Sequence, residues 1–429
     1  MPGRAMTDAR ILVVGAGLAG LAAAAALARA GHRVLVVDQA LRPGGAVHRQ
    51  PLPGGRSLAS SAQARRWRAL MAEVDAQGAR IEIVCNTRFG GVDHTGTVLL
   101  TGEGAALINP RALVLAVGAR EAVQPRPGWT LPGVTTAGAL QTQIKTTAEA
   151  PAGRVLLAGS GPLLLALGAE LVRLGRPPLA IVEAGRPFSR PLRSLGLPLS
   201  YMAEAARHLS RLLAARVPLL TGAHLTRISE ADGALMAEVE TRSGARRFAA
   251  DRIGLHDGIR TNDTGLTDCA ALPVLRLGDC REALGANAAL ADGRAGGEAL
   301  AARLAGQPAP TASTTLAREA SAQARLAQIY AHDGATRLAG LPDDTVICRC
   351  EMRTLADLRT LGPAPTTRQL RLDGRFGMGA CQGRFCAEWV ARIASPIAPH
   401  ALGMPRWPAR PISVADLLAA PDLTLGETK

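Results

Sequence analysis

The chain has 429 residues, of which 48% are hydrophobic, so it can bury two or three cores and exceeds one ordinary domain. Its formal net charge of +14 comes almost wholly from arginine, because lysine occurs only at Lys145 and Lys429. Aromatic residues make up 3%, and no arginine cluster is interleaved with Tyr or Phe, which argues against the stacking surface of a single-strand nucleic-acid binder. We therefore expect a multidomain globular protein with no nucleic-acid partner.

The N-terminal region predicts a βαβ unit of the dinucleotide-binding type. The β-branched run at 10–14 predicts a buried strand, the Ala- and Leu-rich stretch ending near Gly31 predicts a helix, and 33–38 predicts a second strand. The loop at 15–20 reads Gly-Ala-Gly-Leu-Ala-Gly, the spacing of a phosphate-binding turn. The motif is specific because strand, loop, helix and second strand follow in the required order.

Four residues of this unit are candidate nucleotide ligands. Gly15 allows a tight turn, Gly17 lets the backbone approach a pyrophosphate, and Gly20 lets the helix pack closely on the strand. The N-terminus of the helix attracts the phosphates. Asp38 ends the second strand, where a carboxylate accepts hydrogen bonds from a ribose. The motif alone does not distinguish FAD from NAD.

Later segments resemble the flavoproteins with two dinucleotide-binding domains and favour FAD at this first site. One strand runs into a small-residue turn at Gly118, and another runs into Gly278-Asp279 before an Ala- and Gly-rich helical stretch at 286–302. In those flavoproteins a Gly-Asp pair holds the ribityl chain, which implies that Asp279 is a flavin ligand. The same resemblance places Gly44-Gly45 near the isoalloxazine ring. An ordinary helix N-cap is the alternative role for Asp279.

A second βαβ signal lies between these parts. A strand at 154–158 leads into Gly159-Ser-Gly161, and a later strand ends at Glu183. Leu164 stands where the third glycine of the motif belongs, and its bulk would hold the helix further from the strand. Three outcomes are open for this inserted domain: it binds NAD(P)H, it binds another adenine nucleotide, or it keeps the fold without a ligand. Gly159, Gly161 and Glu183 are its candidate cofactor residues.

Four cysteines near the C-terminus predict a metal centre. Cys348 and Cys350 lie on one loop, and Cys381 and Cys386 lie on a later, glycine-rich one. Four thiolates from two loops suit a [2Fe–2S] cluster, a frequent electron partner of a flavin. Structural zinc also takes four cysteines but favours Cys-x2-4-Cys spacing, so it is the poorer match and stays as the alternative.

The remaining candidate side chains point to no catalytic set. Cys85, Cys269 and Cys280 do not make a disulfide framework, and free thiols fit a reducing compartment, so we expect a cytoplasmic protein. Residues 44–60 lack cysteine and no Cys-x-x-Cys occurs, which argues against a disulfide reductase. The histidines are isolated from any nucleophile, so no catalytic residue is assigned; His48 draws notice because it follows Gly44-Gly45 closely.

The expected fold class is α/β, with two Rossmann-like dinucleotide-binding domains, one inserted in the other, and a small, mainly helical [2Fe–2S] domain. The expected division is a discontinuous FAD domain at 1–135 and 250–305, an inserted nucleotide-binding domain at 136–249, a linker and helix at 306–340, a [2Fe–2S] domain at 341–400 and a tail at 401–429. No apolar run reaches the roughly eighteen residues needed to cross a bilayer, so we expect no membrane span.

Specific motifs give the chain a family resemblance. Cys348-x-Cys350 is similar to the [2Fe–2S] domain of bacterioferritin-associated ferredoxin, although the closing pair here is Cys-x4-Cys rather than Cys-x2-Cys. That closing pair, with Gly118-Ala-Arg-Glu and the segment 127–134, resembles the α-type subunits of heteromeric amine and imino-acid dehydrogenases. This group includes opine oxidases, hydrogen cyanide synthase and D-hydroxyproline or proline dehydrogenases. The chain departs from it at Val117, where the family often has threonine near the flavin.

The resemblance implies a flavin and iron–sulfur electron-transfer subunit of an enzyme that oxidises an amino-acid-derived amine of the opine, hydroxyproline, proline or glycine type. The amine would be oxidised on a D-amino-acid-oxidase-like β-type flavoprotein subunit. Electrons would leave for an external acceptor, and a further small ferredoxin-like subunit is a second candidate partner. Two alternatives are a self-sufficient NAD(P)H-dependent flavin reductase that passes electrons through the cluster, and a non-catalytic structural or assembly subunit.

Overall fold

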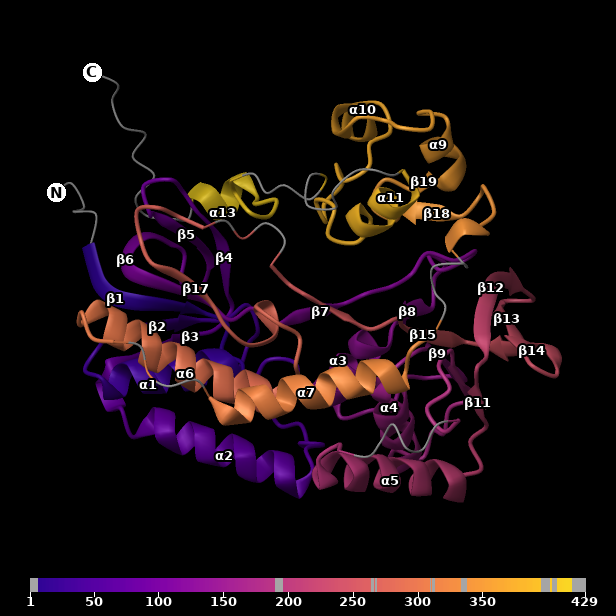
Figure 1. Ribbon diagram of the computed structural model, residues 1–429, viewed down its shortest axis with the longest axis horizontal. Helices are drawn as coiled ribbons and strands as arrows, with labels where there is room; N and C mark the ends of the chain where they lie inside the picture. Colours follow the sequence, from indigo (N-terminus) through magenta and orange to yellow (C-terminus); the bar gives the residue numbers. More distant parts are fainter. Residues whose placement is uncertain are drawn as a thin grey trace.

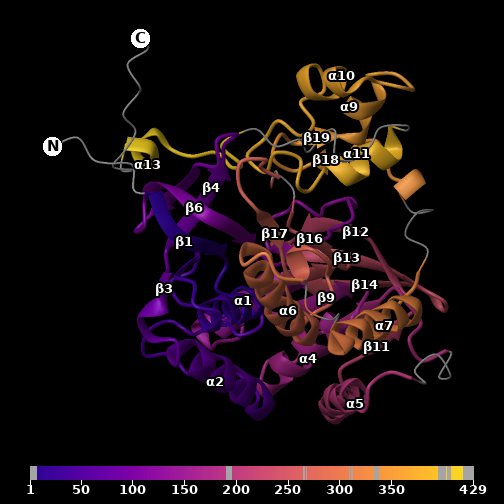
Figure 2. The same ribbon diagram turned by 60° about the vertical axis from the view of Figure 1, so that its left-hand side comes forward.

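The architecture consists of two α/β units side by side and a smaller unit at the upper right, above the second of them (Figure 1). The computed structural model describes residues 7–189, 196–263, 266, 268–308, 310, 313–332, 338–394, 402 and 407–418. Parts of the expected linker, cysteine domain and C-terminal tail therefore lie outside the described residues. The turned view in Figure 2 keeps the smaller unit above the strands β12 and β13 of the second unit.

The first unit is built on a seven-stranded sheet with the order β3-β2-β1-β6-β5-β4, in which β17 also pairs with β6. Its strands are β1 (Thr7–Val14), β2 (Val34–Val37), β3 (Ile81–Val84), β4 (Thr87–Val92), β5 (Val98–Gly102), β6 (Ala106–Leu115) and β17 (Val274–Arg276). The strands β3, β2, β1, β6 and β17 run parallel to one another, whereas β5 is antiparallel to β6 and to β4. All four residues of β2 are buried, as its continuous apolar run predicts.

Helices cover this sheet closely because their facing residues are small. They are α1 (Leu18–Arg29), α2 (Ser61–Asp75) and α6 (Ala286–Leu304), with the 3-10 turns η1 (Gly78–Arg80) and η3 (Gly278–Cys280). A Cβ atom added at Gly293 of α6 would lie 2.2 Å from the carbonyl oxygen of Ala19 in α1. At this point the two helix backbones approach too closely for a side chain on α6.

The second unit has a five-stranded parallel sheet with the order β11-β10-β9-β15-β8. Its elements are β8 (Val134–Thr136), α3 (Ala137–Thr147), β9 (Val155–Gly159), α4 (Pro162–Arg173), β10 (Ala180–Glu183), α5 (Leu199–Ala214), β11 (Leu219–Thr221) and β15 (Arg252–His256), with an antiparallel sheet of β12 (His224–Ala231), β13 (Ala234–Thr241) and β14 (Gly244–Ala250). Because β8 and β15 both belong to it, the unit reaches beyond the expected insert 136–249 at each end. The Rossmann-like α/β fold predicted from the sequence is confirmed.

Two short strands connect the units. They are β7 (Ala119–Glu121), through which the chain leaves the first unit, and β16 (Ile259–Thr261), through which it returns. The two pair antiparallel, with Arg120 opposite Arg260. The chain therefore crosses between the two units in both directions at this ribbon.

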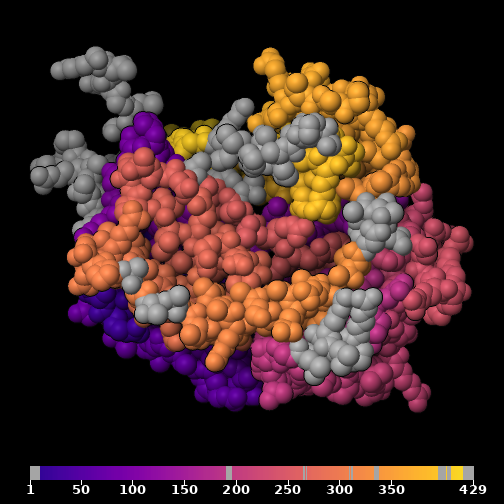
Figure 3. Space-filling model, viewed as in Figure 1, coloured from indigo at the N-terminus to yellow at the C-terminus, as the bar shows by residue number. Residues whose placement is uncertain are grey.

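One long helix bridges both units. This is α7 (Thr314–Ile329), which runs as an orange band across the face of the molecule (Figures 1 and 3). Its Glu319 carboxylate accepts a hydrogen bond of 2.6 Å from the Tyr201 hydroxyl of α5 and one of 3.3 Å from the Asn287 amide of α6. Since α5 and α6 belong to different units, α7 ties the units together.

The C-terminal unit, called the cysteine module below, consists of residues 338–394. Its elements are β18 (Val346–Cys348), β19 (Arg353–Thr354), α9 (Leu355–Arg359), α10 (Thr367–Leu372) and α11 (Ala387–Ile393), and α13 (Val414–Leu418) follows them. Phe376, Leu370 and Val390 are fully buried in its core. Capping boxes begin α9 at Thr354 and α10 at Thr366, which explains how such short helices are defined. Within the described residues, no helix is both long and apolar enough to cross a membrane.

Candidate functional site

The first glycine loop joins β1 to α1 with contacts that dictate glycine at two of its three positions. Gly15 has φ +107°, and an added Cβ would lie 2.4 Å from the carbonyl oxygen of Ala116. A Cβ on Gly20 would lie 1.9 Å from the carbonyl oxygen of Gly15. A Cβ on Gly17 would meet nothing closer than the Cα of Gly45, at 3.8 Å. The backbone at Gly17 is thus exposed to open space beside the loop, where a pyrophosphate would approach.

That space belongs to a cavity of about 460 Å³ that the first unit shares with the cysteine module. The predicted residues that line it are Gly15, Gly17, Asp38, Gly44, Gly45, Gly118 and Asp279. Asp38 accepts hydrogen bonds of 2.7 Å from the amides of Ala16 and Ala40, so its carboxylate is fixed at the tip of β2. The structure thus gathers residues that are more than 200 positions apart in the sequence.

Asp279 has a local role as well as a place in the cavity wall. Its Oδ1 accepts hydrogen bonds from the amides of Leu284, at 3.0 Å, and Gly285, at 2.9 Å, just before α6 begins. Burial raises the pKa of Asp279, although these amides oppose the rise. Asp279 is not the N-cap of α6, because that position is Gly285 and carries no side-chain cap. Its hydrogen bonds hold the turn before the helix and are compatible with the predicted flavin role, because the amides engage Oδ1 and leave Oδ2 for a ligand.

A lysine that was not among the predicted site residues supports the loop containing Gly44-Gly45. Lys145 of α3 donates to the carbonyl oxygens of Ala46, at 3.1 Å, and Val47, at 3.3 Å. Burial lowers the pKa of this ammonium group. The sequence carried one signal, since Lys145 is the single lysine before the C-terminal residue in a chain that otherwise uses arginine. Its partners could not be inferred, because they lie about a hundred positions away in the sequence.

His48, in the same loop, is a buried neutral base. It is 4% exposed and stacks on Trp67 with ring centroids 5.5 Å apart, and its Nε2 has no hydrogen-bond partner among the described residues. Burial, then the charges of Arg66 and Lys145, lower its pKa from 6.5 to about 4. The unfolded chain therefore takes up a proton at a higher pH than the folded protein does.

This difference predicts a loss of stability in acid. The contribution of His48 to the free energy of unfolding is fully present above about pH 6.5, where the imidazole is neutral in both states. It falls as the pH drops toward 4, by up to about 3 kcal/mol, because the unfolded state binds the proton first. Urea unfolding at pH 7 and pH 5 measures the effect. The variant His48→Gln, which cannot be protonated, should show a flatter pH dependence than the parent protein. An unchanged pH dependence in that variant would contradict the assignment.

In the second glycine loop, at 159–161, hydrogen-bonding groups are already occupied by other residues of the chain. Glu183 is 2% exposed, and its carboxylate accepts hydrogen bonds from the Ser160 hydroxyl at 2.7 Å and the Gly161 amide at 3.0 Å. The Ser160 hydroxyl also lies 3.0 Å from the carbonyl oxygen of Tyr330, the residue that ends α7. Burial raises the pKa of Glu183 despite these bonds. Unlike Asp38, therefore, Glu183 does not present its carboxylate to an open cavity.

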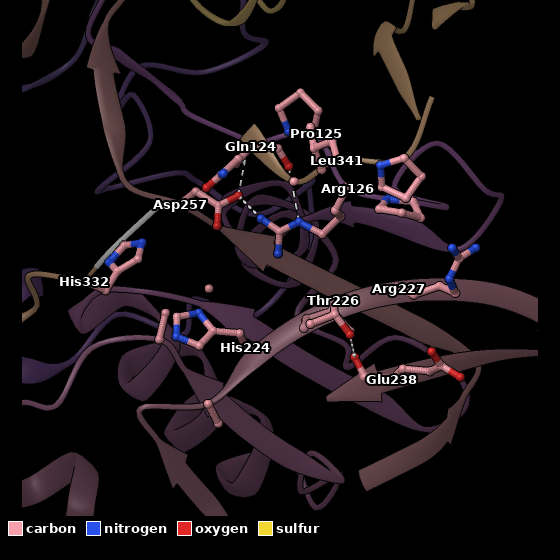
Figure 4. A pocket seen from close by; sticks show the side chains of 17 residues that line it. Gln124, Pro125, Arg126, His224, Thr226, Arg227, Glu238, Asp257, His332 and Leu341 are labelled. Atoms are coloured by element: carbon pink, nitrogen blue, oxygen red, sulfur yellow. Dashed lines mark hydrogen bonds and ion pairs between the residues drawn. The ribbon is translucent and has the colours of Figure 1, made fainter. Parts of the chain in front are cut away.

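A separate cavity of about 360 Å³ lies at the carboxyl edge of the second sheet (Figure 4). Asp257, which follows β15, pairs with Arg126 at 2.5 Å and accepts the Gln124 amide at 2.8 Å. His224 and His332 face one another on one side of it, with ring centroids 6.3 Å apart. Ligands of parallel α/β sheets bind at this edge. A pocket therefore exists in the second unit, but beside the closed loop.

The four predicted cysteines meet in the cysteine module as two pairs. Cys348 and Cys386 are buried and close enough for a thiol–thiol hydrogen bond, and the same holds for Cys350 and Cys381 nearer the surface. The bond from Cys386, then the amides of Glu351, Gly377 and Cys350, lower the pKa of Cys348. Among the described residues, no group of three or more His, Cys, Asp or Glu side chains has the geometry of a metal site. The structure therefore brings the four thiols together without showing a cluster.

Fold and cavity together fit one class of protein, the flavoprotein oxidoreductases built from two Rossmann-like units. The chain belongs to the pyridine nucleotide-disulphide oxidoreductase family, whose sequence model matches residues 9–281. It is an FAD-dependent oxidoreductase, as its sequence predicts.

Full-length relatives are similar to the whole chain. An opine oxidase subunit of Agrobacterium tumefaciens (strain Ach5) is 31% identical over 470 residues, covering 96% of this chain and 92% of the relative. Hydrogen cyanide synthase subunit HcnB of Pseudomonas aeruginosa is 31% identical over 453 residues, covering 94% and 97%. The crystal structure of L-proline dehydrogenase from P. horikoshii shares the fold, with a TM-score of 0.61, 15% identity and coverage of 96% and 79%. The predicted resemblance to subunits of opine oxidases and hydrogen cyanide synthase is confirmed.

Proposed function

We propose that the protein is the flavin and iron–sulfur electron-transfer subunit of a heteromeric enzyme that oxidises an amino-acid-derived amine. The observation that carries this proposal is the shared cavity, because the loop of Cys381 and Cys386 contributes Arg384 to the wall that also contains Gly17 and Gly118. A flavin in the cavity would therefore adjoin the cysteine module. Such proximity is what electron transfer between the two centres requires.

The chain's own residues fit both groups. Gly15, Gly17 and Asp38 would hold the nucleotide half of FAD, while Gly44, Gly45, Gly118 and Asp279 would surround its flavin half. The predicted residues Gly20 and Gly278 do not line the cavity and would act through close packing, because added Cβ atoms there would lie 1.9 Å from the Gly15 oxygen and 2.6 Å from the Ala19 Cβ. A [2Fe–2S] cluster needs two thiolates at each iron, and the pairs Cys348/Cys386 and Cys350/Cys381 supply them. When bound, the flavin would accept two electrons and the cluster would pass them on singly.

The relatives support the presence of a partner chain. Two of them are named as subunits of an opine oxidase and of hydrogen cyanide synthase, and each aligns over nearly the whole chain. We infer that a D-amino-acid-oxidase-like flavoprotein subunit oxidises the amine and that this chain receives the electrons. They would leave for a small ferredoxin-like subunit or for an external acceptor. The cytoplasmic location, inferred from the free thiols, stays a prediction.

The reductase alternative has less support. It requires NAD(P)H at Gly159, Gly161 and Glu183, but Glu183 is buried and the backbone of Tyr330 lies against Ser160. A ribose could reach Glu183 only after the end of α7 had moved. Anaerobic addition of NADH should therefore leave the visible flavin band oxidised, whereas dithionite should bleach it. Rapid bleaching by NADH would favour the reductase.

The proposal is tested by the composition of the anaerobically purified protein. We expect one flavin and about two irons with two acid-labile sulfides per chain, and an absorption shoulder of [2Fe–2S] type beside the flavin bands. Zinc without iron or sulfide would refute the electron-transfer role. A flavin and cluster that the complete complex cannot reduce with any amine would instead favour the structural role.

A further inference from the structure

Two arginines from distant parts of the chain line the cavity on the side of the cysteine module. Arg120 lies in β7, two residues after Gly118, and Arg384 lies between Cys381 and Cys386. Both side chains are half-buried. They stand where the expected flavin and the expected cluster come together.

The guanidinium group of Arg384 is fixed by hydrogen bonds to two backbone carbonyl groups. Its Nη1 donates to the carbonyl oxygen of Cys381 at 3.1 Å, and its Nη2 donates to that of Ala409 at 3.0 Å. The amide of Ala409 donates in turn to the carbonyl oxygen of Gly90 in β4, at 2.6 Å. The guanidinium group is thus fixed between the cysteine loop and the first sheet.

Arg120 has a buried Nε without a hydrogen-bond partner among the described residues. Burial, then Arg260, lower the pKa of its guanidinium, while the charges of Glu388, Asp263 and Cys381 oppose the shift. Glu388 of α11 is itself gripped by Arg260, with Nε–Oε2 and Nη2–Oε1 distances of 3.2 and 3.0 Å. Arg120 of β7 and Arg260 of β16 therefore both lie beside Glu388 of the cysteine module. Cys381 is close enough to interact electrostatically with Arg120 and Arg384.

We propose that the charges of Arg120 and Arg384 favour electron transfer from the flavin to the Cys381 side of the cluster by making the cluster easier to reduce. This inference rests on the proposed function. The flavin would lose one electron and the cluster would gain it, with no covalent bond formed or broken. The half-buried guanidinium groups of Arg120 and Arg384 would stabilise the added negative charge on the cluster more strongly than a fully solvated charge could. Arg120 does the same for negative charge on the reduced flavin.

The test measures midpoint potentials of the intact protein, with dithionite, mediators, flavin absorbance and the electron paramagnetic resonance signal of the reduced cluster. In Arg120→Gln we expect the cluster to become harder to reduce by about tenfold in equilibrium constant, about 59 mV for one electron. The flavin potential should fall as well. Arg120→Lys keeps the charge and should restore much of both potentials. Iron and flavin contents, measured first, show that each variant is loaded.

Arg349 provides the matched control. It is exposed and lies between Cys348 and Cys350, but it is not part of the cavity wall. Arg349→Gln removes an exposed charge that is next in sequence to two cluster ligands, so we expect a smaller, solvent-screened shift of the cluster and an unchanged flavin potential. A loaded Arg120→Gln protein with both potentials unchanged would overturn the inference. So would an equal effect of Arg349→Gln on both centres. A parent protein without iron would overturn the proposed function itself.

Discussion

Replacing Cys386 by serine is expected to remove the iron–sulfur centre and to leave the flavin in place. Cys386 is 1% exposed and pairs with Cys348 in the core of the module. Loss of one of four thiolate ligands should reduce iron from about two per chain to a small fraction and abolish the cluster shoulder. The module should also lose stability, because a metal centre that forms with the fold stabilises it. Iron, sulfide and flavin assays on one preparation measure all of this.

Cys269→Ser is the matched control for that variant. Cys269 lies outside the four-cysteine set, and its thiol donates to the carbonyl oxygen of Asp93 at 3.3 Å, a bond that a serine hydroxyl can replace. Iron content should therefore match the parent protein. Full iron in Cys386→Ser would show that this residue is not a ligand. Equal iron loss in both variants would point to general instability.

Replacing Gly17 by alanine is expected to weaken flavin binding without unfolding the protein. The backbone of Gly17, with φ −84° and ψ −172°, suits an L-residue, and the new Cβ would have its nearest neighbour at 3.8 Å. The methyl group would instead occupy the space beside the loop that a pyrophosphate needs. We expect FAD affinity to fall at least about tenfold, roughly 1.4 kcal/mol, with little change in apoprotein stability. Flavin titration of the apoprotein and thermal unfolding provide the two measurements.

Gly20→Ala is the matched comparison for Gly17→Ala, because it also adds one methyl group to the first glycine loop. Its Cβ would lie 1.9 Å from a backbone oxygen, so α1 must move away from β1. Overpacking of this kind is expected to destabilise the protein by about 3 kcal/mol or more. If Gly17→Ala binds FAD normally, the cavity beside the loop is not the pyrophosphate site. If Gly17→Ala is as unstable as Gly20→Ala, the expectation that its methyl group enters open space is wrong.

Elements that are marked by a pattern of residues close together in the sequence could be predicted from it. The buried strands β1, β2 and β9, the glycine loops after β1 and β9, and the helices α6 and α7 each have a local pattern of apolar, glycine or charged residues. The candidate ligands Gly17 and Asp38 followed from the same local pattern, and the structure places both in one cavity. In the cysteine module, α11 begins only at Ala387, because turns fill the loop that contains Cys381 and Cys386.

The sequence by itself determined the two Rossmann-like units, the family of the protein and the four cysteines, because each depends on spacing along the chain. Only the tertiary structure decided which of two similar loops is open. Asp38 and Glu183 end equivalent strands, but Tyr330 packs against the second loop from a helix about 150 positions away. Lys145, Arg120 and Arg384 likewise had no local pattern to mark them. Their roles arise from contacts between distant segments, and such contacts form only when burial of the cores brings those segments together.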